Sequence, residues 1–282
     1  MAEGSHLDGW TEMGPDWEVP PPMRTDIAHG ARIYDYFIGG KDNFPADRAA
    51  AEHVLELRPS LALAARANRR FMCRAVEYVA SQGIRQFLDI GTGIPTSPNT
   101  HEVAQSVIPE ARVVYVDNDP MVLVHARALL VSAPEGRTAY IDADVRDPSS
   151  ILDHPSLRKV LDLTEPVCLM LVALLHFVAD EEDPYGLVAQ LLDACPSGSR
   201  LILTHGTEDF SDEAGARALQ AYRASGVNLH LRPHAAVLRF FDGLELAEPG
   251  LQLVNRWRPD NDLDRQARPQ DITWYGAVAS KP

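Results

Sequence analysis

The sequence predicts a doubly wound α/β fold, with a mostly parallel, seven-stranded sheet and an N-terminal helical cap. Two patterns indicate this architecture. From residue 86 onward, short runs rich in Val, Ile and Leu alternate with longer helical stretches, and apolar strands separated by helices are typical of a parallel sheet covered on both faces. Before residue 84, the apolar residues recur at helical spacing.

The chain divides into three expected segments. Residues 1–26 mix acidic residues with Trp10, Trp17 and three consecutive prolines, which favours a flexible acidic leader. This segment lacks the apolar stretch of about 7–15 residues that a signal peptide needs. Residues 27–83 form the helical cap, and residues 84–282 form the α/β core. Three helices are expected in the cap, at residues 31–38, 46–57 and 61–81.

Strands and helices alternate through the core. The runs that predict parallel strands are residues 86–90, 112–116, 138–141, 167–172 and 200–204. Helices are expected between and after them, at residues 99–107, 120–131, 149–153, 184–194, 212–224 and 233–241.

The C-terminal part of the core has a different pattern. Two further apolar runs, residues 251–257 and 272–279, are separated by residues 258–271, which have no apolar periodicity and are expected to form a loop. Two strands so close together predict a hairpin, with antiparallel pairing at the edge of the sheet.

Composition and charge exclude several classes of partner. The 282 residues contain 26 Lys and Arg against 40 Asp and Glu, a net charge of −14, and such a field repels polyanions. We therefore expect no nucleic acid and no membrane as partner. Cys73, Cys168 and Cys195 are odd in number and lie in predicted helices or strands, which indicates reduced core thiols and a cytoplasmic protein.

A glycine-rich turn follows the first predicted strand. Asp89 lies in that strand, and Gly91, Thr92 and Gly93 form the turn. In an open parallel sheet, ligands bind beyond the carboxyl ends of the strands, where glycines let the backbone approach closely. We therefore expect these four residues to line a cofactor site.

Acidic residues end the next two strands. Asp117, followed by Asn118, is placed to accept the hydroxyls of a ribose. Asp144 is placed to accept from an adenine amino group, and the Val145 amide to donate to a ring nitrogen. The alternative is that these acids only cap the following helices. The ordered series of turn, ribose acid and base acid favours a cofactor site.

The turn lacks the features that hold a pyrophosphate. A dinucleotide fingerprint requires a third glycine, but position 96 is threonine, and Pro95 and Pro98 delay the next helix to about residue 99. The sequence therefore favours a nucleoside cofactor without phosphate, of which S-adenosylmethionine is the common one. A nicotinamide-dependent oxidoreductase is the less favoured alternative.

These motifs resemble those of class I S-adenosylmethionine-dependent methyltransferases. More narrowly, the chain from about residue 27 is similar to a family of actinobacterial methyltransferases first catalogued as a domain of unknown function. The segments that carry this likeness are residues 31–44, 88–96 and 174–178. The resemblance implies the fold and the cofactor and leaves the methyl acceptor open.

The end of the fourth strand is expected to face the acceptor. Ala173 and Leu174 are expected to line the cofactor pocket, and His176 resembles in position the catalytic histidine of small-molecule O-methyltransferases. A histidine there is a candidate base. However, Phe177 and Val178 depart from the Leu-His-Asp-Trp-like pattern, and the alternative is a histidine bonded to backbone beneath the cofactor.

The cap supplies a second candidate surface. Residues 39–43, Gly-Gly-Lys-Asp-Asn, together with Tyr36, are interpreted as lid and acceptor floor, with Lys41 and Tyr36 as candidate catalytic residues. The alternative is a helix C-cap in which Gly39 adopts a left-handed conformation and the charged residues are solvated. Asn68 and Arg69 are candidates for a bridge between lid and cofactor, and the alternative is that residues 66–70 form a solvated helix face.

No metal site is expected. His230 and His234 have metal-like spacing, but Pro233 intervenes and no third ligand is evident; His205 is a candidate substrate contact. The sequence thus predicts methyl transfer to a small-molecule hydroxyl or amine. The main alternative is a protein that binds S-adenosylmethionine without turnover, and the oligomeric state stays open.

Overall fold

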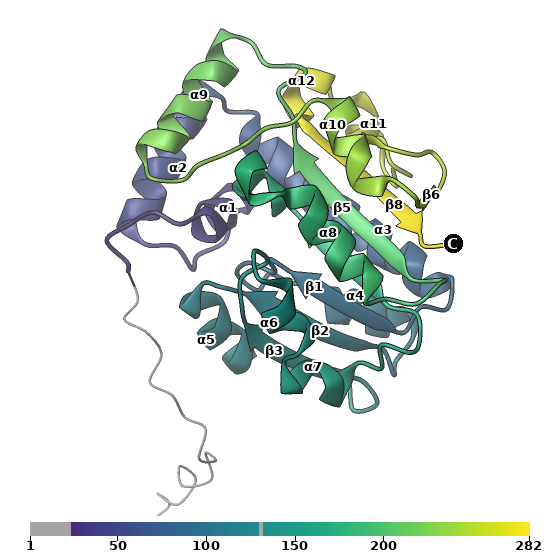
Figure 1. The fold of residues 1–282 in the computed structure, drawn as a ribbon. Helices are drawn as coiled ribbons and strands as arrows, with labels where there is room; N and C mark the ends of the chain where they lie inside the picture. The colour runs from purple at the N-terminus through teal and green to yellow at the C-terminus, as the bar shows by residue number, and fades with distance from the viewer. Residues whose placement is uncertain (1–23, 130–131) are drawn as a thin grey trace, which may run out of the picture.

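The computed structural model describes residues 24–129 and 132–282 (Figure 1). Most of the predicted acidic leader, residues 1–26, therefore lies outside the described residues, as do the last two residues of the helix expected at 120–131. Within the described ranges, none of the helices has the length and apolar character needed to cross a lipid bilayer.

A central sheet organises the fold, with the strand order β3-β2-β1-β4-β5-β8-β6 and β7 paired to β8. The five strands expected to be parallel pair in parallel, and β8 runs antiparallel to β5. The strands are β1 (Gln86–Ile90), β2 (Arg112–Asp117), β3 (Arg137–Asp142), β4 (Cys168–Val172), β5 (Arg200–Gly206), β6 (Glu245–Leu246), β7 (Gln252–Leu253) and β8 (Trp274–Ser280). The prediction of a doubly wound, mostly parallel sheet is confirmed.

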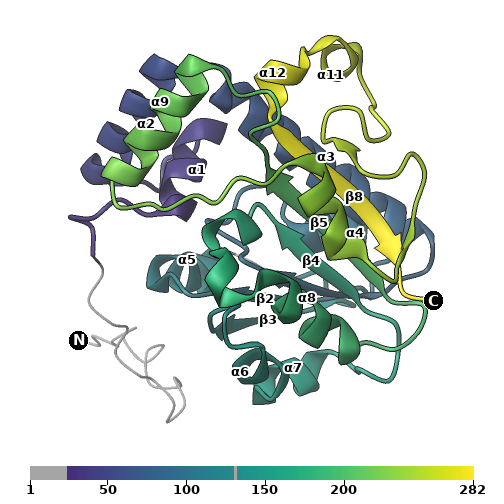
Figure 2. The same cartoon turned by 45° about the horizontal axis from the view of Figure 1, so that its top comes forward.

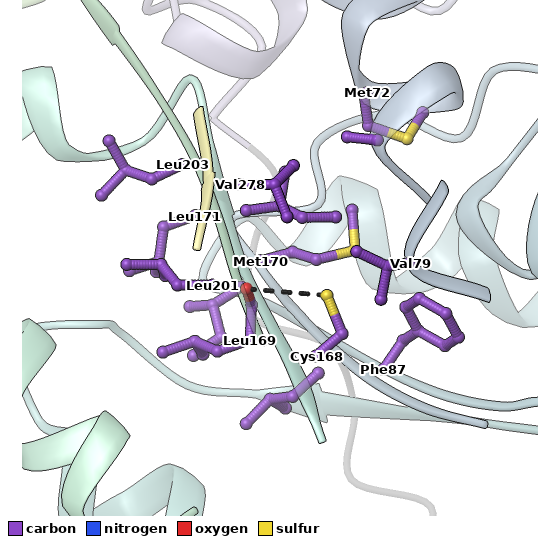
Figure 3. Close-up of a cluster of buried hydrophobic side chains, with 14 of the residues drawn as sticks. Met72, Val79, Phe87, Cys168, Leu169, Met170, Leu171, Leu201, Leu203 and Val278 are labelled. Carbon is purple, nitrogen blue, oxygen red and sulfur yellow. Dashed lines mark hydrogen bonds between the residues drawn. The ribbon is translucent and has the colours of Figure 1, made fainter. Parts of the chain in front are cut away.

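The core strands are apolar on successive residues because both faces of the sheet are covered. Figure 3 shows Cys168 and Met170 of β4 on the side of Met72, whereas Leu169 and Leu171 lie on the side of Leu201 and Leu203. All of these side chains are buried, so each strand contributes to two hydrophobic layers.

Helices supply the two covering layers. α3 and α4 pack together on one face of the sheet, and α6 and α8 pack together on the other (Figures 1 and 2). The core helices are α3 (Leu61–Ser81), α4 (Thr100–Val107), α5 (Pro120–Leu129), α6 (Pro148–Leu152), α7 (Pro155–Val160), α8 (Pro184–Asp193) and α10 (His234–Leu238), with 3-10 turns η1 (Leu175–Phe177), η2 (Asp180–Glu182) and η3 (Arg239–Phe241). α7 was not expected from the sequence.

A second, smaller hydrophobic cluster lies above the carboxyl edge of the sheet. There α1 (Gly30–Ile38) and α2 (Pro45–Leu57) pack with α9 (Glu213–Ala224), which follows β5 in the chain (Figure 2). The buried residues of this cluster include Ile33, Val54 and Ala218. α3 reaches from this cluster into the main core. The group of α1, α2 and α9 is called the lid below.

The C-terminal region departs from the expected hairpin. The antiparallel strand is present as β8, but the run at 251–257 forms only the two-residue strand β7. The segment 258–271, expected to be a loop, contains the short helices α11 (Asp262–Gln266) and α12 (Pro269–Ile272). The buried Asp264 explains this difference, since its carboxylate pairs with Arg70 and Arg74 of α3 and holds the segment against the core.

Candidate functional site

A cavity of about 600 Å³ lies between the carboxyl ends of the parallel strands and the lid. β1 and β4 are parallel neighbours in the sheet but not in the sequence, so the order in which strands are added to the sheet reverses between them. Ligands of doubly wound folds bind at such a point. The cavity brings together every residue predicted to contact the cofactor: Asp89, Gly91, Thr92, Gly93, Asp117, Asn118, Asp144, Val145, Ala173 and Leu174.

The glycine turn offers bare backbone to the cavity. Gly91 and Gly93 have φ of +73° and +68°, a region that side chains with a Cβ rarely adopt. A Cβ on Gly91 would lie 2.6 Å from the Leu174 side chain, whereas one on Gly93 would meet only the Ala31 Cβ, at 4.0 Å. The close approach of Leu174 therefore requires glycine at position 91, whereas Gly93 leaves room for close approach of a ligand.

Asp117 organises the same turn. Its Oδ2 accepts a hydrogen bond of 2.8 Å from the Gly93 amide, and its Oδ1 accepts one of 2.9 Å from the Asp119 amide. Burial raises the pKa of this carboxyl, while the two amides oppose that shift. Each oxygen keeps a second lone pair, so Asp117 can both hold the turn and accept from a ligand hydroxyl.

The cavity wall at the end of β3 carries a charged network. Asn118 donates to Asp144 across 2.7 Å, and the Arg146 guanidinium contacts Asp144, Glu182 and the Phe177 carbonyl. Hydrogen bonds and the Arg146 charge outweigh partial burial and lower the pKa of Asp144. This network joins the end of β3 to the two 3-10 turns after β4, and the sequence reasoning did not find Arg146.

Asp89 is a buried acid on the cavity wall. The Thr100 hydroxyl donates to its Oδ2 at 2.7 Å, but burial dominates and raises the pKa of Asp89 to about 6. Among the described residues no cationic side chain contacts Asp89. A buried carboxylate of this kind favours a positively charged ligand, because such a ligand would offset the cost of burying the negative charge.

The end of β4 has an unusual backbone conformation. Ala173 has φ of +59°, although it carries a Cβ, and such strain concentrates at functional sites. Its amide donates to Thr204 Oγ1 at 2.9 Å. The strained residue turns the chain into η1 and brings His176 to the cavity.

His176 is buried, and its Nδ1 has no hydrogen-bond partner in the described part of the chain. Burial, together with the nearby His205, Arg232 and His230, keeps the pKa of His176 well below its usual range. The ring is therefore neutral at neutral pH. The alternative of a ring bonded to backbone does not hold for Nδ1.

Arg232, which the sequence reasoning missed, fixes the loop that carries His176. Its guanidinium is buried, donates to the carbonyls of Leu175 and Val178 and pairs with Asp180. It also donates to His205 Nε2 at 2.9 Å, and burial lowers the pKa of His205 to about 4. His205 is thus a fully buried partner of Arg232 and is not among the residues that line the cavity.

The glycine pair in the cap has a structural explanation. Gly39 adopts a left-handed conformation with φ of +91° and ends α1, and a Cβ on Gly40 would collide with the Asp35 carboxylate at 1.9 Å. That carboxylate accepts from the Asp42 amide and the Asn43 side chain. The turn is built around Asp35.

Two predicted catalytic residues therefore lie away from the cavity. Lys41 is exposed and is not among the lining residues. The Tyr36 hydroxyl donates instead to the exposed Glu52 at 2.9 Å. The structure thus supports the helix C-cap alternative for this turn and offers no geometry for Lys41 or Tyr36 in the chemistry.

The lid contacts the core beside the expected ribose site. His29 Nδ1 is 3.1 Å from Asp119 Oδ2, and Arg32 reaches both Asp119 and Asp47. Below them, Arg69 donates to the carbonyls of Thr96 and Pro98. Arg69 thus holds the segment that delays α4 and does not contact the lid through these bonds.

The described residues contain no group of three or more His, Cys, Asp or Glu side chains placed to hold a metal. The His230 amide donates to the His176 carbonyl, and the His234 amide donates to Asp209. The backbone amides of His230 and His234 thus hold the segment after β5 in place, and His230 also lines the cavity.

The doubly wound, mostly parallel fold is that of a class I S-adenosylmethionine-dependent methyltransferase. The chain belongs to the S-adenosyl methyltransferase family, whose model matches residues 17–282. Its cofactor is accordingly S-adenosylmethionine, and the nicotinamide alternative is set aside.

Solved structures agree with this assignment. A DUF574 family protein from Streptomyces avermitilis is 55% identical, with a TM-score of 0.89, over 92% of this chain and 99% of that one. A candidate methyltransferase from Thermobifida fusca is 40% identical, with a TM-score of 0.84, over 94% of this chain and 99% of that one. A search of curated proteins finds no match.

Proposed function

We propose that this protein transfers a methyl group from S-adenosylmethionine to a hydroxyl or amine of a small molecule. One observation carries the proposal: the same cavity has the glycine turn and three strand-end acids at one side and, at another, the neutral ring of His176, whose Nδ1 has no hydrogen-bond partner among the described residues.

The cavity fits a cationic nucleoside without phosphate. Asp89, Asp117 and Asp144 line it, and a cradle with three acids favours a sulfonium and disfavours a pyrophosphate. The bare backbone at Gly93 leaves room beside the expected ribose position. We propose that Gly91, Gly93, Asp117, Asn118, Asp144 and Val145 hold the adenosine and that Asp89, Thr92, Ala173 and Leu174 border the rest of the cofactor.

When bound, S-adenosylmethionine supplies a methyl group on a positively charged sulfur, which keeps the electron pair of the broken carbon–sulfur bond and leaves as neutral S-adenosylhomocysteine. The contribution of the protein is then mainly alignment of the acceptor with the donor, which can lower a barrier by roughly 7–11 kcal/mol.

His176 suits an orienting role. Its neutral ring can accept a hydrogen bond from the acceptor O–H or N–H group. Full protonation would create a buried cation close to Arg232, which the low pKa of His176 disfavours. We infer that His176 directs the acceptor lone pair toward the methyl group and that the acceptor proton passes to water.

Calorimetry and label transfer test this function together. We expect S-adenosylmethionine and S-adenosylhomocysteine to bind and NAD and NADP to give no heat. With methyl-labelled cofactor, a small-molecule extract should become labelled. Binding of the sulfonium without any label transfer would favour the alternative of a binding protein without turnover, and binding of NAD alone would contradict the proposal.

A further inference from the structure

The part of the cavity on the β5 and β8 side is lined by aromatic rings. The ring centroids of Tyr34, in α1, and Trp274, at the start of β8, are 6.2 Å apart. Trp274 and His176 lie 5.1 Å apart with their planes at 79°, and Phe177 and Tyr222 extend the lining. Rings attract other rings through offset or edge-to-face contacts, so this wall favours a planar ligand.

One buried side-chain amide in this lining has an oxygen that accepts no hydrogen bond from the described residues. Asn68, in α3, is fully buried, and its Nδ2 donates to the Tyr34 hydroxyl at 3.0 Å. The Tyr34 hydroxyl donates its one proton to the Ala65 carbonyl. It can therefore only accept from Asn68, so the atom of the Asn68 amide that faces Tyr34 is the nitrogen. Asn68 Oδ1 is left without a partner in the described part of the chain, and an unpaired buried acceptor is costly.

Acidic side chains outnumber the arginines that line the cavity. Arg146 contacts Asp144 and Glu182, and Arg58 donates to the Gln270 carbonyl. Arg69 donates to the carbonyls of Thr96 and Pro98, and its Nε has no hydrogen-bond partner in the described part of the chain. Against these three arginines the lining has five acidic residues, Asp35, Asp89, Asp117, Asp144 and Glu182, so the cavity disfavours a ligand carboxylate or phosphate.

We propose that the methyl acceptor is a neutral aromatic molecule that packs against Trp274 and donates a hydrogen bond to Asn68 Oδ1 from an O–H or N–H group other than the one that faces His176. This inference rests on the proposed methyl transfer and adds the class of acceptor. Trp274 and Asn68 are then the residues that determine acceptor specificity, the first by ring contact and the second by supplying an acceptor atom.

Four small probes test this proposal by binding, without any need for turnover. The protein is first saturated with S-adenosylhomocysteine and then titrated with naphthol, methoxynaphthalene, naphthoate or decahydronaphthol in a calorimeter. Naphthol is neutral, aromatic and a donor. Methoxynaphthalene lacks the donor, decahydronaphthol lacks the aromatic ring, and naphthoate lacks the donor and carries a negative charge. Comparison with naphthol therefore isolates the donor and the ring, and comparison of naphthoate with methoxynaphthalene isolates the charge.

Naphthol should bind most tightly. Loss of the donor or of the ring should weaken binding about three- to tenfold, as expected for one hydrogen bond or one aromatic contact. Naphthoate should bind at least about tenfold more weakly than methoxynaphthalene, because its negative charge enters a lining in which acidic residues outnumber arginines. Equal or tighter binding of naphthoate, equal binding of decahydronaphthol, or no binding of naphthol would each overturn the proposal.

Two variants assign the contacts. Asn68→Leu should remove the preference for naphthol over methoxynaphthalene, and Trp274→Leu should remove the preference for naphthol over decahydronaphthol. The control is Gln190→Leu, an amide on the exposed side of α8 that contacts Ser149, which should keep both preferences. If both preferences persist in the folded Asn68 and Trp274 variants, these residues do not select the acceptor.

The two proposals fail in different ways. If S-adenosylhomocysteine does not bind, the proposed methyl transfer is wrong and the acceptor class falls with it. If S-adenosylhomocysteine binds but naphthol does not, only the inferred acceptor class is wrong. The probe series on the unaltered protein decides this even where a variant does not fold.

Discussion

The carboxylate of Asp117 offers the most direct test of the cofactor site. It is only 8% exposed, and its two oxygens accept from the amides of Gly93 and Asp119. Replacing Asp117 with alanine would remove the proposed ribose acceptor and would also leave these two amides without their partner. The substitution should therefore lower both cofactor affinity and stability.

The magnitudes follow from the type of bond. A hydrogen bond to a charged group contributes about 1.5–3 kcal/mol, so Asp117→Ala should weaken S-adenosylhomocysteine binding by about 10- to 150-fold. Loss of the amide partners should lower the free energy of unfolding without ligand by about 1–3 kcal/mol. Asp117→Asn keeps one neutral oxygen and should fall between alanine and the unaltered protein in both measurements.

Calorimetric titration with S-adenosylhomocysteine measures the affinity, and urea unfolding measures the stability. Asp193→Ala, at the exposed end of α8, is the matched control and should change neither quantity. If Asp117→Ala is folded and binds with unchanged affinity, then Asp117 does not hold the ribose and the assignment of the strand-end acids is wrong.

Three further outcomes are expected. His176→Ala should slow methylation about 10- to 100-fold and change S-adenosylhomocysteine affinity by less than about threefold; parallel loss of both would make His176 structural. Because the pKa of Asp89 rises from 3.8 to about 6 on folding, the folded state binds more protons between these values, and the ionised group costs stability above about pH 6, by about 3 kcal/mol at most. Asp89→Asn should therefore stabilise the ligand-free protein to urea at about pH 7.5 but not at about pH 4, and an equal effect at both would refute the linkage. Gly91→Ala, with φ of +73° and a contact of 2.6 Å to Leu174, should weaken cofactor binding and destabilise by about 1–3 kcal/mol, more than the control Gly243→Ala, which has φ of +79° but open space; equal thermal shifts for the two would show that the close contact with Leu174 has no cost.

Local patterns were enough to predict the sheet and the strand-end residues. In a parallel sheet, short apolar runs indicate the position and the boundaries of each strand, and all strands end at the same edge. The glycine turn after the first strand was therefore expected to meet the acids at the ends of the second and third strands, and these residues do line one cavity.

The turn at residues 39–43 shows where local patterns mislead. Two glycines followed by Lys41, Asp42 and Asn43 predict close backbone approach, but the sequence does not say to what. In the structure they approach Asp35 of the preceding helix. A short-range partner and a ligand impose the same requirement for glycine, so only the fold distinguishes them.

The sequence by itself determined the doubly wound sheet, the glycine turn and the acids at the strand ends, because each depends on residues close together in the chain. Only the tertiary structure placed α9 in the lid, Arg232 beneath His176, and Asn68 and Trp274 in one wall, since these residues lie far apart in the sequence and meet through packing alone. Non-local contacts leave no periodic pattern along the chain, and they form the part of the cavity where we expect the acceptor to be chosen.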